Sequence, residues 1–259
     1  MALPTTFFGW VGFIISEYSE LLIGGLLSTL EIALLGTVIG FLIGLLVAIL
    51  RTIPIEEGDS VLRKTLLRIL RGILNIYIEV FRGTPMMVQA MVIYYGSLQV
   101  LGIDMSPGFA GILIVSINTG AYMAEIIRGG IISIDAGQKE AAYSIGMTHW
   151  QSMVHVVLPQ AIRNILPSVG NELIVNIKDS SVLNVIGVSE LYFMAKSAAG
   201  TYLKYFETYF IIAVIYLILT YATSRLLALI ERRMDGPANY VIHGSQSSSK
   251  AAIVVKGGE

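Results

Sequence analysis

The sequence predicts an all-α, polytopic membrane protein with five transmembrane helices. Of its 259 residues, 55% are hydrophobic and 14% are charged, and the mean hydropathy is +0.74. Soluble domains carry about 25% charged residues, so the composition excludes an ordinary water-soluble enzyme. Long apolar segments alternate with short polar ones, and Lys and Arg concentrate in alternate polar segments. Lipid is therefore the expected solvent for most of the chain.

Two classes of function are excluded by counting residues. The formal net charge of −1 leaves no overall basic field for nucleic acid. The chain has no cysteine, which rules out thiol catalysis and thiolate zinc sites. His149, His155 and His243 have no companion ligands at metal-binding spacing, so no metal site and no cofactor are expected.

Five segments are predicted to span the membrane. Residues Leu21–Leu50 would form about 45 Å of helix, more than the hydrocarbon core of about 30 Å requires. In this segment Gly36, Gly40 and Gly44 recur every fourth residue, a spacing suited to close helix packing. The other four spans run approximately from Gly72 to Leu101, Pro107 to Arg128, Ile165 to Val185 and Tyr205 to Ile230.

The two ends of the chain differ from this pattern. Residues 1–20 carry no Lys or Arg, so they lack the basic start of a signal peptide, and Phe7, Phe8, Trp10 and Phe13 predict an interfacial, extracytoplasmic segment. Residues 21–233 form the predicted transmembrane domain. Residues 234–259 are rich in Gly, Ser and Lys and are predicted to be a mobile cytoplasmic tail.

The distribution of positive charge predicts the orientation. Arg51, Arg63, Lys64, Arg68 and Arg71 cluster after the first span, and the positive-inside rule makes that segment cytoplasmic. The N-terminus is then outside. Five spans place residues 129–164 and the C-terminus inside, while the outer segments contain only Lys196 and Lys204.

Residues 129–164 predict two short helices that fold back at a glycine. Asp135 with Gln138, and Thr148 with Gln151, have the spacing of capping boxes, and Gly146 predicts a helix stop. Pro159 is expected to break or kink what precedes it. Taken on these features alone, the segment is either a docking surface for another protein or a simple linker between spans.

Four motifs carry a family resemblance. Glu140-Ala141-Ala142, then Gly146, then Val156-Val157-Leu158-Pro159 closely resembles the signature loop of bacterial ABC-importer permeases, which usually has Ile where this chain has Val156. Three further segments resemble the polar amino acid subfamily: Tyr77–Pro85 with Gln89, Asn118–Gly130, and Lys178–Leu183. The resemblance covers about residues 20–235. It is specific for the subfamily and weak for the individual solute.

The resemblance implies a type I ABC-importer permease fold in a bacterial cell membrane. It also implies three protein partners: a second permease copy, a dimer of cytoplasmic ATPase subunits, and an extracytoplasmic solute-binding protein. In that family the loop docks in a groove of the ATPase. The residues it assigns to this coupling are Glu140, Ala141, Ala142, Gly146, Leu158 and Pro159. The chain has no phosphate-binding glycine loop, so ATP is expected to bind the partner and the chain is not predicted to be an enzyme.

Charged and polar residues inside the spans predict a solute path. A charge near the bilayer centre costs about 2.5 kcal/mol or more, so such residues should face a cavity or a partner. Glu79 and Arg82 are neighbours on one helical face beside a predicted break at Gly83-Thr84-Pro85. Arg suits a planar carboxylate, and Glu suits an ammonium. The predicted path comprises Glu79, Arg82, Thr84, Gln89, Asn118, Tyr122 and Glu125.

Other interpretations of these residues are open. Glu79 and Arg82 could neutralise each other and only pack helices. Asn118, Tyr122 and Glu125 could form a hydrogen-bonded seam between helices. The roles of Glu31, which could reach the outer headgroups, and of Lys178-Asp179, which could form a local salt bridge, are not settled by the sequence.

The function predicted from all of this is a permease subunit of an ABC importer. It would carry a polar amino acid of the glutamine, glutamate, arginine or histidine class into the cytoplasm by alternating access. The alternative is a passive channel or secondary transporter of small zwitterions. A scaffold without transport is disfavoured, because it gains nothing from buried charges at Glu79 and Arg82.

Overall fold

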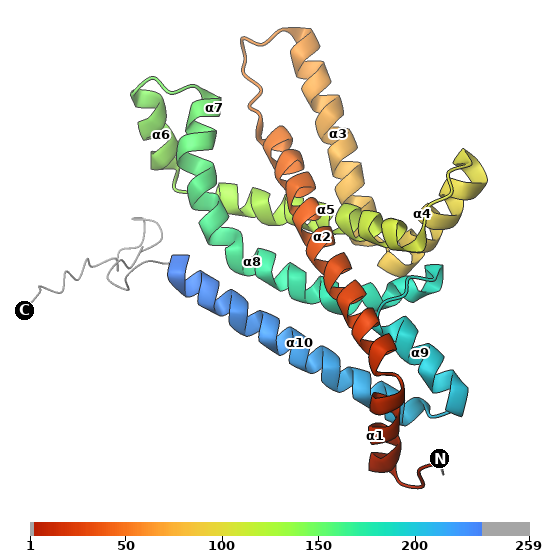
Figure 1. The fold of residues 1–259 in the computed structure, drawn as a ribbon. Helices are drawn as coiled ribbons and strands as arrows, with labels where there is room; N and C mark the ends of the chain where they lie inside the picture. The colour runs from red at the N-terminus through yellow and green to blue at the C-terminus, as the bar shows by residue number, and fades with distance from the viewer. Residues whose placement is uncertain (1–2, 235–259) are drawn as a thin grey trace, which may run out of the picture.

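The computed structural model describes residues 3–234, and every regular element in that range is helical (Figure 1). The all-α prediction is therefore confirmed for the described part of the chain. The elements are α1 (Phe7–Glu17), α2 (Ser19–Thr52), α3 (Val61–Gly83), α4 (Met86–Leu101), α5 (Pro107–Ile132), α6 (Ala136–Ser144), α7 (His149–Ser152), a π-helical turn (Met153–Val157), α8 (Leu158–Asp179), a 3-10 turn (Ser180–Ile186), α9 (Leu191–Tyr202) and α10 (Tyr205–Met234).

Three of these helices are long and apolar enough to cross a membrane by length and composition: α2, α5 and α10. The other two predicted spans are interrupted or charged. The second consists of α3 and α4, which are separated at Thr84 and Pro85, and the fourth consists of α8 and the 3-10 turn that follows it. The prediction of five spans and its orientation stay predictions.

The centre of the molecule is the crossing of α2 and α5. Gly36, Gly40 and Gly44 of α2 lie against Val115, Thr119 and Met123 of α5, one α5 residue for each glycine. A Cβ built on Gly40 would lie 2.7 Å from the Thr119 Cβ, closer than real contacts allow. The glycine spacing seen in the sequence thus sets how closely these helices approach.

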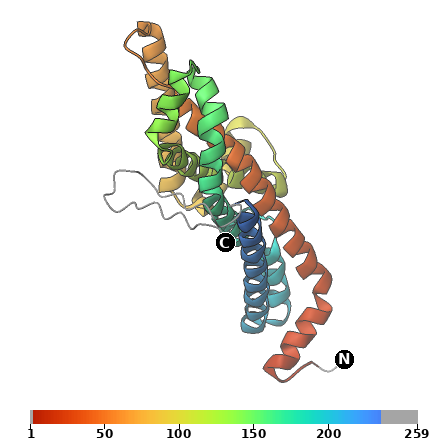
Figure 2. The same ribbon diagram turned by 90° about the vertical axis from the view of Figure 1, so that its left-hand side faces the viewer.

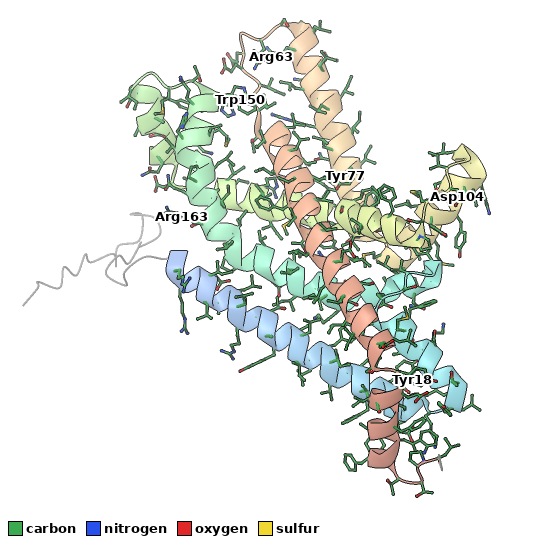
Figure 3. All side chains as sticks on the ribbon, in the orientation of Figure 1. Tyr18, Arg63, Tyr77, Asp104, Trp150 and Arg163 are labelled. Atoms are coloured by element: carbon green, nitrogen blue, oxygen red, sulfur yellow. The ribbon has the colours of Figure 1, made fainter. Side chains whose placement is uncertain are left out.

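Two polar connecting segments lie at the same end of the molecule. The loop from α2 to α3 and the α6–α7 elbow occupy one end, and α1 with the turn from α9 to α10 occupies the other (Figures 1 and 2). In Figure 3, Arg63 and Trp150 mark the first end and Tyr18 marks the opposite one. The arrangement agrees with the sequence-based placing of residues 51–71 and 129–164 on one side.

Helix boundaries differ from the predicted spans for a simple reason. α3 begins at Val61, not near Gly72, because Ser60 caps it by accepting the Arg63 N–H at 3.3 Å and nothing in the basic segment interrupts it. α8 likewise begins at Leu158, before the predicted Ile165. Hydropathy locates the apolar part of a helix and not its polar extension. The predicted tail, residues 234–259, lies outside the described residues except for its first residue, which ends α10.

Candidate functional site

The predicted helix break is present between α3 and α4. Thr84 (φ −122°, ψ 148°) and Pro85 (φ −64°, ψ 135°) are extended, so the chain leaves α3 after Gly83 and re-enters a helix at Met86. Pro85 cannot donate a backbone hydrogen bond, and the residue before a proline avoids the helical region. The last carbonyls of α3 consequently need other donors.

Two of the predicted path residues supply those donors. The buried Gln89 amide, 7% exposed, donates to the Phe81 carbonyl at 3.0 Å and the Thr84 carbonyl at 2.9 Å. Asn118 of α5 donates to the Gln89 Oε1 at 2.8 Å and also approaches the Phe81 carbonyl at 3.2 Å. Thr84 donates back to the Val80 carbonyl at 2.7 Å. The break is therefore fixed by a polar network that joins α3, α4 and α5.

Glu79 and Arg82 do not pair with each other. Both are exposed on α3, and the ion pairs within the described residues do not include either of them. The Arg82 guanidinium carbon instead lies 5.5 Å from the centre of the Tyr122 ring on α5, a cation–π contact. The interpretation of a self-neutralised pair is therefore not supported. The two side chains leave a cation and an anion available beside the break.

Glu125 lies in a different setting, at the α2–α5 seam. Its carboxylate accepts hydrogen bonds from Arg51 of α2 and from Arg128, at 3.0 Å to Nε and 2.8 Å to Nη2. Both carboxylate oxygens are thus occupied by guanidinium groups. Glu125 ties the end of α2 to α5, as the alternative of an interhelical seam requires, and its place on a solute path stays a prediction.

The elbow between α6 and α7 turns at Gly146. Its φ of +85° lies in the left-handed region, and no atom lies within 4 Å of a Cβ built there, so backbone conformation and not space favours glycine. The predicted capping box at Thr148 and Gln151 is present. Asp135 caps α6 through the Gly137 N–H at 2.7 Å, but its capping box with Gln138 is absent, because the Gln138 side chain faces Gln160, 3.5 Å away.

The predicted coupling residues present two kinds of surface. Glu140 and Ala141 are exposed on α6, while Ala142 packs inward. Leu158 and Pro159 begin α8, and the chain does not leave the helix before Pro159, as a break would require. Instead a π turn at Met153–Val157 joins α7 to α8, and the path continues as helix. The role of the predicted coupling residues in docking an ATPase stays a prediction.

The loop between α2 and α3 lies close to this elbow. Burial lowers the pKa of His149, the positive charge of Lys139 acts in the same direction, and the negative charge of Glu56 acts against both. Tyr143 of α6 lies 3.3 Å from the His149 Nδ1. Two segments that are distant in the sequence therefore share one end of the molecule.

Sequence reasoning missed two buried polar centres. Asn176 of α8, 3% exposed, donates to Thr37 of α2 at 2.8 Å and to Thr119 of α5 at 3.0 Å. Glu190, fully buried, caps α9 by accepting the Tyr192 and Phe193 N–H groups at 2.9 and 2.7 Å, and it accepts the Tyr216 hydroxyl at 3.1 Å. Two sequence signals could have found these centres: Asn176 is an amide within an apolar span, and Glu190 is an acid just after the turn at Gly187.

Comparison with known proteins identifies the family. The family described as "Binding-protein-dependent transport system inner membrane component" matches residues 64–236. The chain belongs to this family. The match begins in the first turn of α3 and contains the helix break, the elbow and α10.

Individual relatives match this chain over most of its length. The glutamine transport system permease protein GlnP of Escherichia coli K12 is 39% identical over 217 residues, which are 83% of this chain and 93% of the relative. The arginine transport system permease protein ArtQ of Bacillus subtilis is 34% identical over 210 residues, covering 81% and 90%.

Solved structures give the same fold. The structure of an amino acid ABC transporter with histidines has a TM-score of 0.75 and 41% identity, covering 89% of this chain and 99% of that one. A structure of the MetNI methionine ABC transporter has a TM-score of 0.69 at 22% identity, covering 84% and 97%. The second likeness concerns the fold alone.

Proposed function

We propose that the chain is the membrane-spanning permease subunit of an ABC importer that carries polar amino acids into the cytoplasm by alternating access. The observation that supports this most directly is the pair of charges Glu79 and Arg82, which form no ion pair within residues 3–234, beside a broken helix. The names of the relatives, which are glutamine and arginine transport permeases, support the solute class.

The chemistry of the break fits a zwitterion. Arg82 offers a planar guanidinium for a carboxylate, and Glu79, on the same face of α3, offers an acceptor for an ammonium. The Tyr122 ring holds the guanidinium on the α5 side. Gln89, Asn118 and Thr84 keep the break rigid, so the charges need no reordering when a solute arrives. Broken helices at membrane depth serve this purpose in other transporters.

The proposed topology has five spans, with the N-terminus outside and the C-terminus cytoplasmic. α2, α5 and α10 are three of the spans, and α3 with α4, and α8 with its 3-10 turn, complete the five. The Lys and Arg residues near α2, α3 and the elbow then lie on the cytoplasmic side of the bacterial cell membrane. Polar interruptions in the two irregular spans are expected where they line a cavity.

The exposed elbow is the proposed docking surface for the ATPase partner. α6 offers Glu140 and the small Ala141 to a cytoplasmic ATPase dimer, with Ala142, Gly146, Leu158 and Pro159 shaping the turn behind it. A second permease copy and an extracytoplasmic solute-binding protein complete the importer. ATP would bind the ATPase, and we assign no cofactor to this chain.

The test is uptake of radiolabelled amino acid by the assembled transporter in proteoliposomes. Arg82→Ala should lower uptake at least tenfold, because a carboxylate loses its charge-assisted partner, and Arg82→Lys should restore only part of it. Arg68→Ala is the matched control, since Arg68 is exposed on the same helix away from the break. Its uptake should be unchanged.

Two results would contradict the proposal. Normal uptake by Arg82→Ala would remove the break from the solute path. Uptake by vesicles that hold this chain without the ATPase subunits would instead favour a channel or a secondary transporter.

A further inference from the structure

Glu31 occupies an unusual position on α2. The exposed face of this helix carries a stripe of large apolar residues at helical spacing, and Glu31 lies within that stripe and is itself exposed. The apolar members are Leu27, Leu34, Val38, Leu42 and Leu46. None of the ion pairs between described residues includes Glu31. A carboxylate among exposed apolar side chains is unfavourable in lipid unless a cation or a hydrogen-bond donor binds it.

A cavity of about 480 Å³ lies beside this carboxylate. Three separate segments form its walls: Ser28 to Ile32 on α2, the first turn of α5 at Pro107–Phe109, and the turn at Gly187–Ser189. Ser106 accepts the Phe109 N–H at 3.4 Å, and Gly108, whose N–H has no acceptor within the helix, lines the cavity. The α2 wall carries the Glu31 carboxylate and the Ser28 hydroxyl, and the other two walls carry the Gly108 N–H and the Ser189 hydroxyl.

The depth of the cavity can be measured along two helices. At about 1.5 Å per residue, Glu31 lies about 30 Å along α2 from Arg51, which is the thickness of a hydrocarbon core. Along α5, Pro107 lies about 27 Å from Glu125, the partner of Arg51. Because α2 and α5 cross, these axial lengths are upper limits on depth, and both put the cavity on the opposite side of the crossing from the Arg51–Glu125–Arg128 cluster, toward the opposite leaflet (Figure 1).

We propose that this cavity binds the headgroup of an aminophospholipid. The lipid ammonium pairs with Glu31, and its phosphate accepts hydrogen bonds from the Gly108 N–H at the start of α5 and from the hydroxyls of Ser28 and Ser189. The acyl chains lie along the apolar stripe of α2. A phosphatidylglycerol headgroup has no ammonium and is repelled by the carboxylate. The proposal rests on the proposed function only for the membrane setting and for the identity of the leaflet.

The test is lipid retention by the full transporter complex, measured by native mass spectrometry after release from nanodiscs that contain equal amounts of phosphatidylethanolamine and phosphatidylglycerol. The wild type should retain phosphatidylethanolamine preferentially, and Glu31→Gln should lower that retention about fivefold. Glu20→Gln is the matched control, because Glu20 is exposed in the first turn of the same helix outside the cavity. It should retain lipid as the wild type does.

A second measurement needs no variant. Replacing phosphatidylethanolamine by phosphatidylcholine, whose ammonium is methylated, should lower retention by the wild type, because the hydrogen bonds to Glu31 are lost. Equal retention by wild type and Glu31→Gln, or equal retention of both headgroups, would overturn the proposal.

Free amino acid shares the ammonium and the anionic group, so it serves as a competitor. Retention that is unaffected by millimolar glutamine supports a lipid site, and displacement of lipid by glutamine would assign the cavity to the solute instead. Because retention needs no transport, Arg82→Ala should leave it unchanged, which separates failure of this proposal from failure of the proposed function.

Discussion

At the scale of single residues, the same kinds of side chain serve two purposes. Gln89 and Asn118 were predicted to lie on the solute path, and in the structure they hold the helix break by satisfying the Phe81 and Thr84 carbonyls. Glu79 and Arg82 of the same region have no hydrogen-bonded partner among the described residues. A polar residue in a span is therefore best assigned by asking whether its hydrogen bonds are already made within the chain.

Replacing Gln89 by leucine tests the structural half of this distinction. The Thr84 carbonyl would lose its donor, the Phe81 carbonyl would keep only Asn118, and the Asn118 amide would lose its acceptor. Each polar group left unsatisfied away from water costs about 1–3 kcal/mol. We expect a lower melting temperature of the purified transporter, measured by intrinsic fluorescence. Gln99→Leu, on the exposed side of the same helix, should have no such effect. Equal melting temperatures for the two variants would show that the amide is not needed at the break.

At the scale of elements, the elbow depends on one backbone conformation. Gly146 adopts a left-handed φ of +85°, and the Gly146 and Met147 N–H groups donate to the Tyr143 and Ala142 carbonyls at 2.9 and 3.1 Å. The stop signal was readable from the sequence. The π turn that follows was not, because no local pattern separates it from an α-helix.

Gly146→Ala should therefore weaken ATPase docking without preventing membrane insertion. A left-handed residue other than glycine costs about 1–2 kcal/mol, and the elbow can avoid that cost by unwinding. Co-purification of the ATPase with the variant should fall several-fold. Gly58→Ala, in the neighbouring loop with open space around it and no left-handed φ, is the control. Unchanged co-purification would remove the elbow from the docking surface.

At the scale of the whole molecule, the crossing of α2 and α5 positions the ion-pair cluster, the Glu31 cavity and α8. It places the ion-pair cluster of Arg51, Glu125 and Arg128 at one side and the Glu31 cavity at the other. The Asn176 network then ties α8 to the same crossing. The helix break is joined to this crossing by Asn118 of α5, and the elbow is joined to it through α8.

Gly40→Leu should disrupt this arrangement as a whole. The added side chain would meet Thr119 at a crossing with no spare space, and overpacking of this kind costs about 1–3 kcal/mol. We expect a smaller monodisperse fraction in size-exclusion chromatography in detergent. Gly24→Leu, on the same helix with nothing within 4 Å of its Cβ, should behave as the wild type. Equal profiles would show that the crossing tolerates a wider separation.

The sequence by itself determined the all-helical class, the glycine face of α2, the break at Thr84-Pro85 and the turn at Gly146. Each of these depends on residues that are neighbours along the chain or lie on one helical face. Only the tertiary structure decided that Arg128 and Arg51 share Glu125, that Arg82 rests on Tyr122 instead of pairing with Glu79, and that Asn176 joins three helices. The physical reason is that a buried charge or amide takes its partner from whichever helix packs beside it, and that choice is made between segments far apart in the chain.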